Sequence, residues 1–290
     1  MNIDKLYENV EAKGHVCVGL DTAADYVPEI ERKKAVNDAQ AVLAFNKALI
    51  DATHDVSACF KVQIAYYEEM GIEGLKAYSE TLKYIKQKNC LSIADIKRGD
   101  IADTAQRYAN AHFAGEFEAD FVTISPYMGM DSVEPWLKEA QKNGKGAFVL
   151  MRTSNPGMKD FQYLNFNASA KLYNIVGEKM QNIANSYTGK HGYGIFGVVV
   201  GCTEREEAEQ IRKTYGSLFF LIPGYGAQGG AAQDAAVLLK NGNGGVVNAS
   251  RSIITAWKTE NIINAGNREA ADAARRAAIK MRDDIQDALK

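Results

Sequence analysis

A short segment of the chain concentrates opposite charges at close spacing. Asp95 and Lys97 are two positions apart, and Asp100 follows three positions later. Residues two apart at a strand end can point to the same side, and Lys61 stands near the end of an earlier apolar run. A lysine between aspartates stays protonated, because opposite charges favour the charged form. The pattern predicts a proton-donating lysine and disfavours a Schiff-base aldolase, which needs a neutral amine.

A glycine-rich segment, GYGAQG at 224–229, offers a second kind of chemistry. It matches the dinucleotide-binding pattern G-x-G-x-x-G, but dinucleotide-binding folds also have an acidic residue at the end of the next strand. Here the next apolar run ends in Asn248-Ala249-Ser250-Arg251. Glycines let backbone N–H groups approach an anion, and arginine offers a bidentate fork. Tight turns alone would explain the glycines but not Arg251, so the segment favours a phosphate site.

Eight short apolar runs, each followed by an amphipathic stretch, must position these residues. The runs are rich in β-branched and aromatic residues, which predicts strands at 16–20, 58–62, 91–95, 121–125, 147–151, 195–200, 218–222 and 245–249. The intervening stretches have helical periodicity at 33–52, 74–87, 101–114, 132–142, 168–186, 204–214, 230–240 and 268–289. In the first of these we expect Val36 to share the apolar face. Alternating strands and helices imply βαβ units and a parallel sheet.

Eight such units predict an α/β fold: a single (β/α)8 TIM barrel, with residues 1–290 as one domain. A doubly wound open sheet is the alternative, because periodicity does not show closure. A barrel carries its active site at the C-terminal ends of its strands, where the charged residues fall. A structural ladder of ion pairs could also place charges there, but the cost of desolvating them favours a functional site. The stretch from Arg152 to Asn167, after strand five, is expected to form an active-site lid.

Composition excludes several other classes of protein. The 34 Lys+Arg and 36 Asp+Glu give a net charge of −2, which argues against coating nucleic acid or an anionic membrane. No apolar run approaches the roughly 18 residues of a membrane span, and the start of the chain has no signal-peptide core. The cysteines form no C-x-x-C pair, so we expect buried thiols and a cytoplasmic protein. None of the four histidines lies at the end of a predicted strand, so we expect neither a histidine-based catalytic triad nor a histidine metal site.

The segment DIKRGDIADT at 95–104 resembles the D-x-K-x-x-D-I-x-x-T signature of the orotidine 5′-phosphate decarboxylases. Other segments agree in order with the longer bacterial subfamily, type 2: GLD at 19–21, FKVQ at 60–63, RTSNPG at 152–157, PGYGAQGG at 223–230 and NASRSI at 248–253. The resemblance runs from about residue 16 to 255. Sugar-phosphate barrels share D-x-K-x-x-D, but the whole set of segments is specific to the family.

The resemblance implies a carboxy-lyase that converts orotidine 5′-phosphate to uridine 5′-phosphate in de novo pyrimidine biosynthesis. It implies neither cofactor nor metal. The catalytic residues it implies are the charged tetrad Lys61, Asp95, Lys97 and Asp100. Within the tetrad, Lys97 would protonate the C6 carbanion left by CO₂, and Asp95 would lie near the substrate carboxylate.

The same resemblance implies a set of substrate-binding residues and a partner. Asp21 would bind the ribose and Ser154 would face the pyrimidine edge. The 5′-phosphate would contact Gln228, Ser250 and Arg251. In the family, the residues matching Asp100 and Thr104 reach into the neighbouring subunit's site, so a homodimer is expected. Tyr225 is not assigned a phosphate contact, because the loop around it differs.

Two other functions remain possible on the sequence. A magnesium-dependent sugar-phosphate decarboxylase or synthase of the same superfamily would need an acid at the end of strand two. Lys61 stands there, and a cation would repel Mg²⁺. A non-catalytic protein that binds nucleotide phosphates would need the phosphate residues but not the tetrad.

Overall fold

The computed structural model, which describes residues 1–166, 170–226 and 231–290, contains eight parallel strands closed into a barrel in chain order. Closure is made by β1 and β8, where Val16 pairs with Val247. The closed barrel confirms the predicted (β/α)8 fold and excludes the open sheet. The strands are β1 (Val16–Leu20), β2 (Cys59–Gln63), β3 (Leu91–Arg98), β4 (Phe121–Ile124), β5 (Gly146–Arg152), β6 (Phe196–Val200), β7 (Phe220–Ile222) and β8 (Gly245–Ala249).

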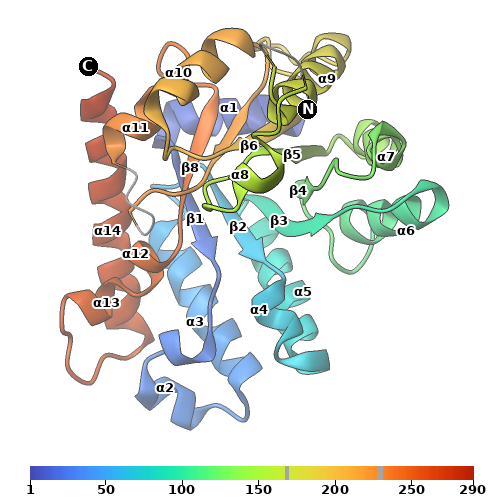
Figure 1. Cartoon of the computed structure of the whole chain (residues 1–290). Coiled ribbons are helices and arrows are strands. Elements are labelled where there is room, and N and C mark those ends of the chain that lie inside the picture. The colour runs from blue at the N-terminus through green and yellow to red at the C-terminus, as the bar shows by residue number, and fades with distance from the viewer. Residues whose placement is uncertain (167–169, 227–230) are drawn as a thin grey trace.

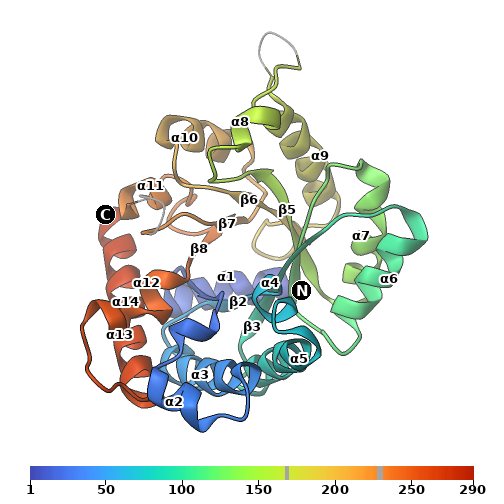
Figure 2. The ribbon, with the colours of Figure 1, turned by 60° about the horizontal axis from the view of Figure 1, so that its bottom comes forward.

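The helices form a ring around the strands (Figures 1 and 2). They are α1 (Asn2–Lys13), α2 (Glu29–Lys34), α3 (Asp38–Thr53), α4 (Ala65–Glu68), α5 (Gly71–Gln87), α6 (Ala102–Phe113), α7 (Glu134–Asn143), α8 (Met158–Phe161), α9 (Leu172–Ser186), α10 (Arg205–Thr214), α11 (Ala232–Ala236), α12 (Arg251–Ile254), α13 (Ala256–Thr259) and α14 (Asn267–Ala288). Nearly every strand residue is buried. This burial on both faces explains why the strands are continuous apolar runs rather than alternating ones.

The helix α1 lies across the N-terminal end of the barrel. The Asn2 amide side chain donates to Asp120 just before β4, and the Asn9 side chain donates to the Ala58 carbonyl just before β2. With this end closed by α1, the opposite end, where the strands have their carboxyl termini, is left for a binding site.

Two predicted helices have different boundaries in the structure. The stretch 33–52 is divided between α2 and α3, because the Asn37 side chain accepts a hydrogen bond from the Gln40 N–H at 2.9 Å and starts a new helix there. Val36 consequently lies between the helices and is 84% exposed, so its placement on the apolar face was wrong. Of the predicted helix 230–240, the described residues 231–240 are helical only over the short α11.

The cysteines Cys17, Cys59, Cys90 and Cys202 are free and buried, as the sequence predicts. Of the four histidines, His15 and His112 are also buried, and His112 lies in the last turn of α6. Within the described ranges, no helix is both long and apolar enough to cross a membrane.

Candidate active site

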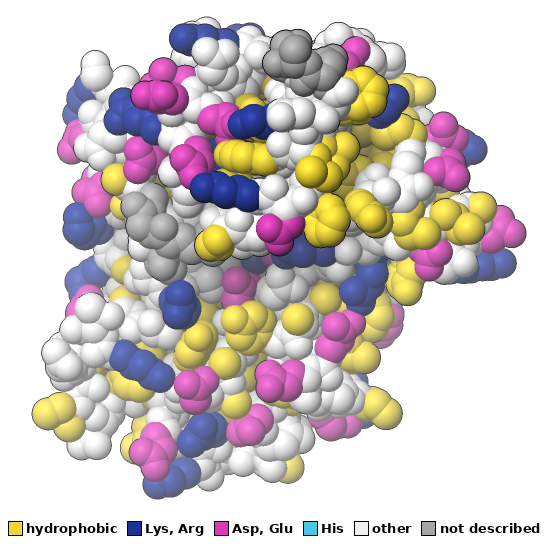
Figure 3. Space-filling model, viewed as in Figure 1, with side chains coloured by type: hydrophobic (Ala, Val, Ile, Leu, Met, Phe, Trp, Pro, Cys, Tyr) yellow, Lys and Arg dark blue, Asp and Glu magenta, His cyan; other side chains and the backbone are white. Residues whose placement is uncertain are grey.

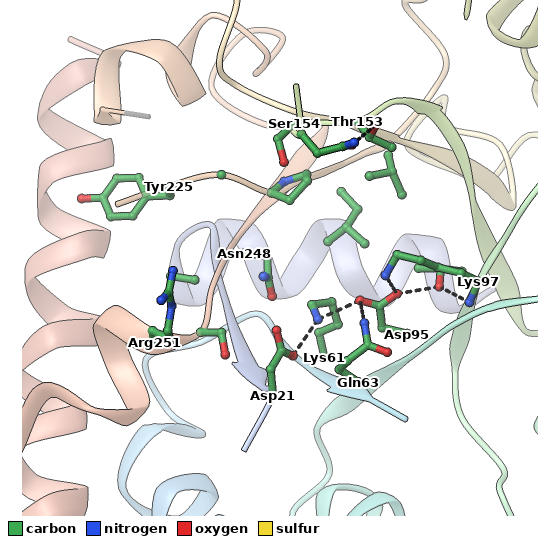
Figure 4. A pocket seen from close by; sticks show the side chains of 18 of the residues that line it. Asp21, Lys61, Gln63, Asp95, Lys97, Thr153, Ser154, Tyr225, Asn248 and Arg251 are labelled. Atoms are coloured by element: carbon green, nitrogen blue, oxygen red, sulfur yellow. Dashed lines mark hydrogen bonds and ion pairs between the residues drawn. The ribbon is translucent and has the colours of Figure 1, made fainter. Parts of the chain in front are cut away.

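A cavity of about 490 Å³ opens at the C-terminal end of the barrel. Because parallel strands end on the same side, residues far apart in sequence meet there. The lining includes seven of the residues that the sequence singled out: Asp21, Lys61, Asp95, Lys97, Ser154, Ser250 and Arg251. All of these except Ser250 are labelled in Figure 4. The charged residues that follow β1 or belong to β2 and β3 lie at one end of the cavity, and Arg251 lies at the other (Figure 4).

The charged residues form a continuous row. Lys61 Nζ lies 2.9 Å from Asp21 Oδ1 and 2.9 Å from Asp95 Oδ2. Lys97 Nζ lies 2.6 Å from the other oxygen of Asp95, Oδ1. Charges therefore alternate from Asp21 through Lys61 and Asp95 to Lys97, as the dashed lines of Figure 4 show.

Two residues that the sequence analysis did not single out complete the surroundings of Asp95. Gln63 Nε2 donates to Asp95 Oδ2 at 2.9 Å, and Thr123 Oγ1 donates to Asp95 Oδ1 at 2.8 Å. With the two lysines, Asp95 accepts four hydrogen bonds, which is about the full capacity of a carboxylate. Asp95 is therefore held in one orientation.

The row of charges fixes the protonation states of its buried members. Burial would raise the pKa of Asp95, but the charges of Lys61 and Lys97 outweigh it and hold that pKa far below its usual range. Burial would likewise lower the pKa of Lys61, but the charges of Asp21 and Asp95 outweigh it and raise that pKa well above its usual value. Both groups are ionised at neutral pH, even though Lys61 is only 4% exposed and Asp95 only 5%.

The two lysines differ in exposure and in the number of carboxylates that they contact. The Lys61 side chain is 6% exposed and its ammonium group is held by two carboxylates. The Lys97 side chain is 48% exposed and contacts one carboxylate. An ammonium group donates three hydrogen bonds, so Lys97 retains donors that face the cavity.

The far end of the cavity contains groups suited to an anion. Arg251 begins α12, and the preceding Ser250 has a buried Oγ with no hydrogen-bond partner in the described part of the chain. Asn248, from β8, also lines the cavity. The Tyr225 hydroxyl points away toward α14 (Figure 4), where it donates to Asp284 Oδ2 at 3.3 Å. Burial and Asp284 raise the pKa of Tyr225 to about 12.

Two predicted site residues, Asp100 and Thr104, are not brought into the cavity of this chain. Asp100 lies beyond β3, where its carboxylate accepts a hydrogen bond from the Ile101 N–H at 2.8 Å. Thr104 is exposed in the first turns of α6. Gln228 lies outside the described residues.

The stretch expected to form a lid begins differently from the prediction. Arg152 is the last residue of β5 and is completely buried, so it cannot be part of a mobile cover. Its guanidinium group donates to the Gly201 carbonyl and lies 3.8 Å from Glu207 Oε2. For the residues after Arg152, the lid remains a prediction. Asn167 lies outside the described ranges.

Comparison with known proteins relates the whole chain to one family. Residues 14–264 match the model of the orotidine 5′-phosphate decarboxylase / HUMPS family. A curated protein of Clostridium perfringens strain 13, named orotidine 5′-phosphate decarboxylase, is 56% identical over 100% of this chain and 99% of its own length. A relative of the same name from Clostridium kluyveri is 56% identical over 98% of this chain and 97% of its own.

The solved structures give the same result for the fold. The structure of Leishmania donovani OMP decarboxylase superposes with a TM-score of 0.78 at 30% identity. The match covers 99% of this chain and 98% of that one.

Proposed function

Because the chain belongs to the orotidine 5′-phosphate decarboxylase / HUMPS family, we propose that its cavity converts orotidine 5′-phosphate to uridine 5′-phosphate and CO₂. The chain is a carboxy-lyase of pyrimidine biosynthesis. The observation that carries this function is the Asp21–Lys61–Asp95–Lys97 row, which faces a cavity with a cationic far end.

In this reaction, Lys97 is the proton donor. The bond from C6 to the carboxylate carbon breaks, CO₂ leaves, and the electron pair stays on C6. Lys97 Nζ then gives a proton to C6, and the product carries a C6–H bond. Lys61 is less suited, because Asp21 and Asp95 already occupy its ammonium group, whereas Lys97 contacts a single carboxylate among the described residues.

The charges around Lys97 stabilise the carbanion without a cofactor. Asp95 orients the Lys97 ammonium group through their ion pair, so that a positive charge lies where negative charge develops on C6. The ionised Asp95 would also lie beside the substrate carboxylate, and that repulsion is relieved when neutral CO₂ leaves.

The rest of the cavity binds the nucleotide. Arg251 and Ser250 hold the 5′-phosphate together with Gln228, because phosphate oxygens suit a guanidinium fork and a hydroxyl that has no partner among the described residues. Asp21 binds the ribose, and Ser154 faces the pyrimidine edge. Phosphate contacts made far from C6 supply binding energy for closing the expected lid over the substrate.

The active protein is a homodimer in which Asp100 and Thr104 complete the partner subunit's site. Their position outside this chain's cavity supports the proposal. Large apolar side chains are exposed beside them, with Ile101 next to Asp100 and Tyr127 and Met128 in the adjoining loop after β4. Figure 3 shows hydrophobic side chains gathered on the side where Figure 1 places α6, α7 and α8. The free, buried thiols suit a reducing compartment, so we place the dimer in the cytoplasm.

The magnesium-dependent alternative fits the cavity poorly. Lys61 Nζ occupies the space between the carboxylates of Asp21 and Asp95, 2.9 Å from each, where a divalent cation would need to bind. We expect wild-type protein to decarboxylate orotidine 5′-phosphate in the presence of a chelator, and Lys97→Ala to lose most of that turnover while still folding. A non-catalytic phosphate-binding protein would be unaffected by Lys97→Ala.

A further inference from the structure

The strand β3 is irregular at the residues that carry the proposed chemistry. Ala94 pairs with Val122 on β4 and Arg98 pairs with Ile124, so the three residues Asp95 to Lys97 lie opposite Thr123 alone. An insertion of this kind is a β-bulge, which interrupts the ladder and leaves backbone groups without strand partners. Lys97 within it has a φ of 45°, a left-handed conformation that is costly for a residue with a side chain.

The hydroxyl of Thr123 supplies the partners that the ladder loses. Its Oγ1 accepts hydrogen bonds from the backbone N–H groups of Ile96 and Lys97, each at 3.0 Å. The same hydroxyl donates to Asp95 Oδ1 at 2.8 Å. One donor and two acceptor sites are all that a hydroxyl has, so this one is fully used. Thr123 is 1% exposed, so bulk water does not compete for these hydrogen bonds in the wild type.

The bulge determines where the Lys97 ammonium group lies. In a regular strand, side chains two apart point the same way, but here the backbone between Asp95 and Lys97 is bulged. The contact of 2.6 Å between Lys97 Nζ and Asp95 Oδ1 therefore depends on the conformation that Thr123 holds. Thr123 Oγ1 contacts both residues of this ion pair. It accepts a hydrogen bond from the Lys97 backbone N–H and donates one to the Asp95 carboxylate.

We propose that Thr123 is a positioning residue for the decarboxylation, which holds the β3 bulge so that the Lys97 ammonium group reaches C6. This proposal rests on the proposed function of Lys97. Without the hydroxyl, the backbone N–H groups of Ile96 and Lys97 and one carboxylate oxygen of Asp95 lose a partner. The strained backbone at Lys97 is then free to relax, and the ammonium group moves with it. A displacement of about 1 Å at a reacting group can cost ~10²-fold in rate.

The test compares Thr123→Ser with Thr123→Ala, since these variants differ only by the hydroxyl. We expect Thr123→Ser to keep kcat within about threefold of wild type, and Thr123→Ala to lose roughly 10²-fold, a typical cost of misplacing a catalytic group. KM should change little, because the phosphate end is untouched. The control is Thr81→Ala: Thr81 is equally buried and its hydroxyl donates to the Ala77 carbonyl inside α5. This variant should keep kcat.

A second measurement does not depend on substrate. Hydrogen exchange of the amides of Ile96 and Lys97 should be fast in Thr123→Ala and slow in wild type and Thr123→Ser. The proposal is overturned if Thr123→Ala and Thr123→Ser have the same kcat, if Thr81→Ala loses as much, or if the two amides stay protected without the hydroxyl. A wild-type protein inactive on orotidine 5′-phosphate would instead refute the proposed function, whatever the exchange rates.

Discussion

The two lysines that share Asp95 should differ sharply in what they contribute to stability. Lys61 lies beneath the cavity with its side chain 6% exposed, between the carboxylates of Asp21 and Asp95. Replacing it by methionine removes the charge while keeping most of the side-chain volume, and leaves Asp95 buried with less compensation. Breaking a buried pair in this way costs about 3–5 kcal/mol, so we expect the free energy of unfolding of Lys61→Met to fall by that amount at pH 7.

The free energy of unfolding should fall much less in Lys97→Met than in Lys61→Met. The Lys97 side chain is 48% exposed, where water screens the pair, and Asp95 keeps its bond to Lys61. Pairs of this kind contribute about 0–1 kcal/mol, and we expect a loss within that range. A matched control is Lys86→Met, which breaks an exposed pair between α5 and Glu118 in the loop before β4 and should change stability by less than about 0.5 kcal/mol.

The pH dependence separates electrostatic loss from lost packing. In the wild type the pKa of Asp95 is lowered by its lysines. Its contribution to stability is therefore present above its unfolded-state pKa of about 3.9 and lost as pH falls through the folded value. In Lys61→Met burial is less opposed, the pKa rises, and protonation relieves the buried charge. The deficit relative to wild type should therefore shrink from pH 7 to pH 5.

Urea unfolding at one protein concentration, followed by circular dichroism, measures all three variants. Equal losses for Lys61→Met and Lys97→Met would refute the view that one lysine supports the fold and the other serves the reaction. A deficit for Lys61→Met that does not change with pH would assign the loss to packing rather than to the charge on Asp95.

Three further predictions address the phosphate end, a buried histidine and the dimer. Arg251→Ala loses a charge-assisted bidentate contact worth about 1.5–3 kcal/mol, so KM for orotidine 5′-phosphate should rise about 10–100-fold; an unchanged KM would remove Arg251 from the phosphate site. Burial lowers the pKa of His112 to about 4. The contribution of neutral His112 to the free energy of unfolding is therefore complete above the unfolded-state pKa of about 6.5. It falls by about 3 kcal/mol as pH drops to 4. Urea unfolding of His112→Phe should not show this loss. When the inactive Lys97→Ala and Asp100→Ala proteins are mixed and reassociated, about a quarter of wild-type activity should return. Half of the dimers then contain one subunit of each variant, and each of these has one intact shared site. If subunits are shown to exchange and no activity returns, shared sites are contradicted.

The fold was predictable because its signals are local. Each strand is a short, continuous run of β-branched and aromatic residues, as in β6 from Phe196 to Val200, and a barrel buries both faces of such strands. The end of a strand could therefore be located from the sequence, and with it Lys61 and Asp95. The boundary between α2 and α3 was missed because it depends on one side-chain cap at Asn37.

The surroundings of the charged row were less predictable because they are formed by contacts distant in sequence. Gln63 and Thr123 look like ordinary strand residues, and only the barrel brings them onto Asp95 from β2 and β4. The spacing of two between Asp95 and Lys97 correctly predicted that they meet, but the regular alternation of a strand was the wrong reason, because β3 is bulged there. One signal was present in the sequence: Gln63 lies two residues after Lys61, on the same face of β2.

The most direct test of the central claim is the absorbance of orotidine 5′-phosphate mixed with purified protein in the presence of a chelator and without added cofactor. The charged row and the cavity predict a steady spectral change to that of uridine 5′-phosphate with wild-type protein, and its near disappearance with Lys97→Ala. An unchanged spectrum with folded wild-type protein, or equal rates for the wild type and Lys97→Ala, would contradict the account.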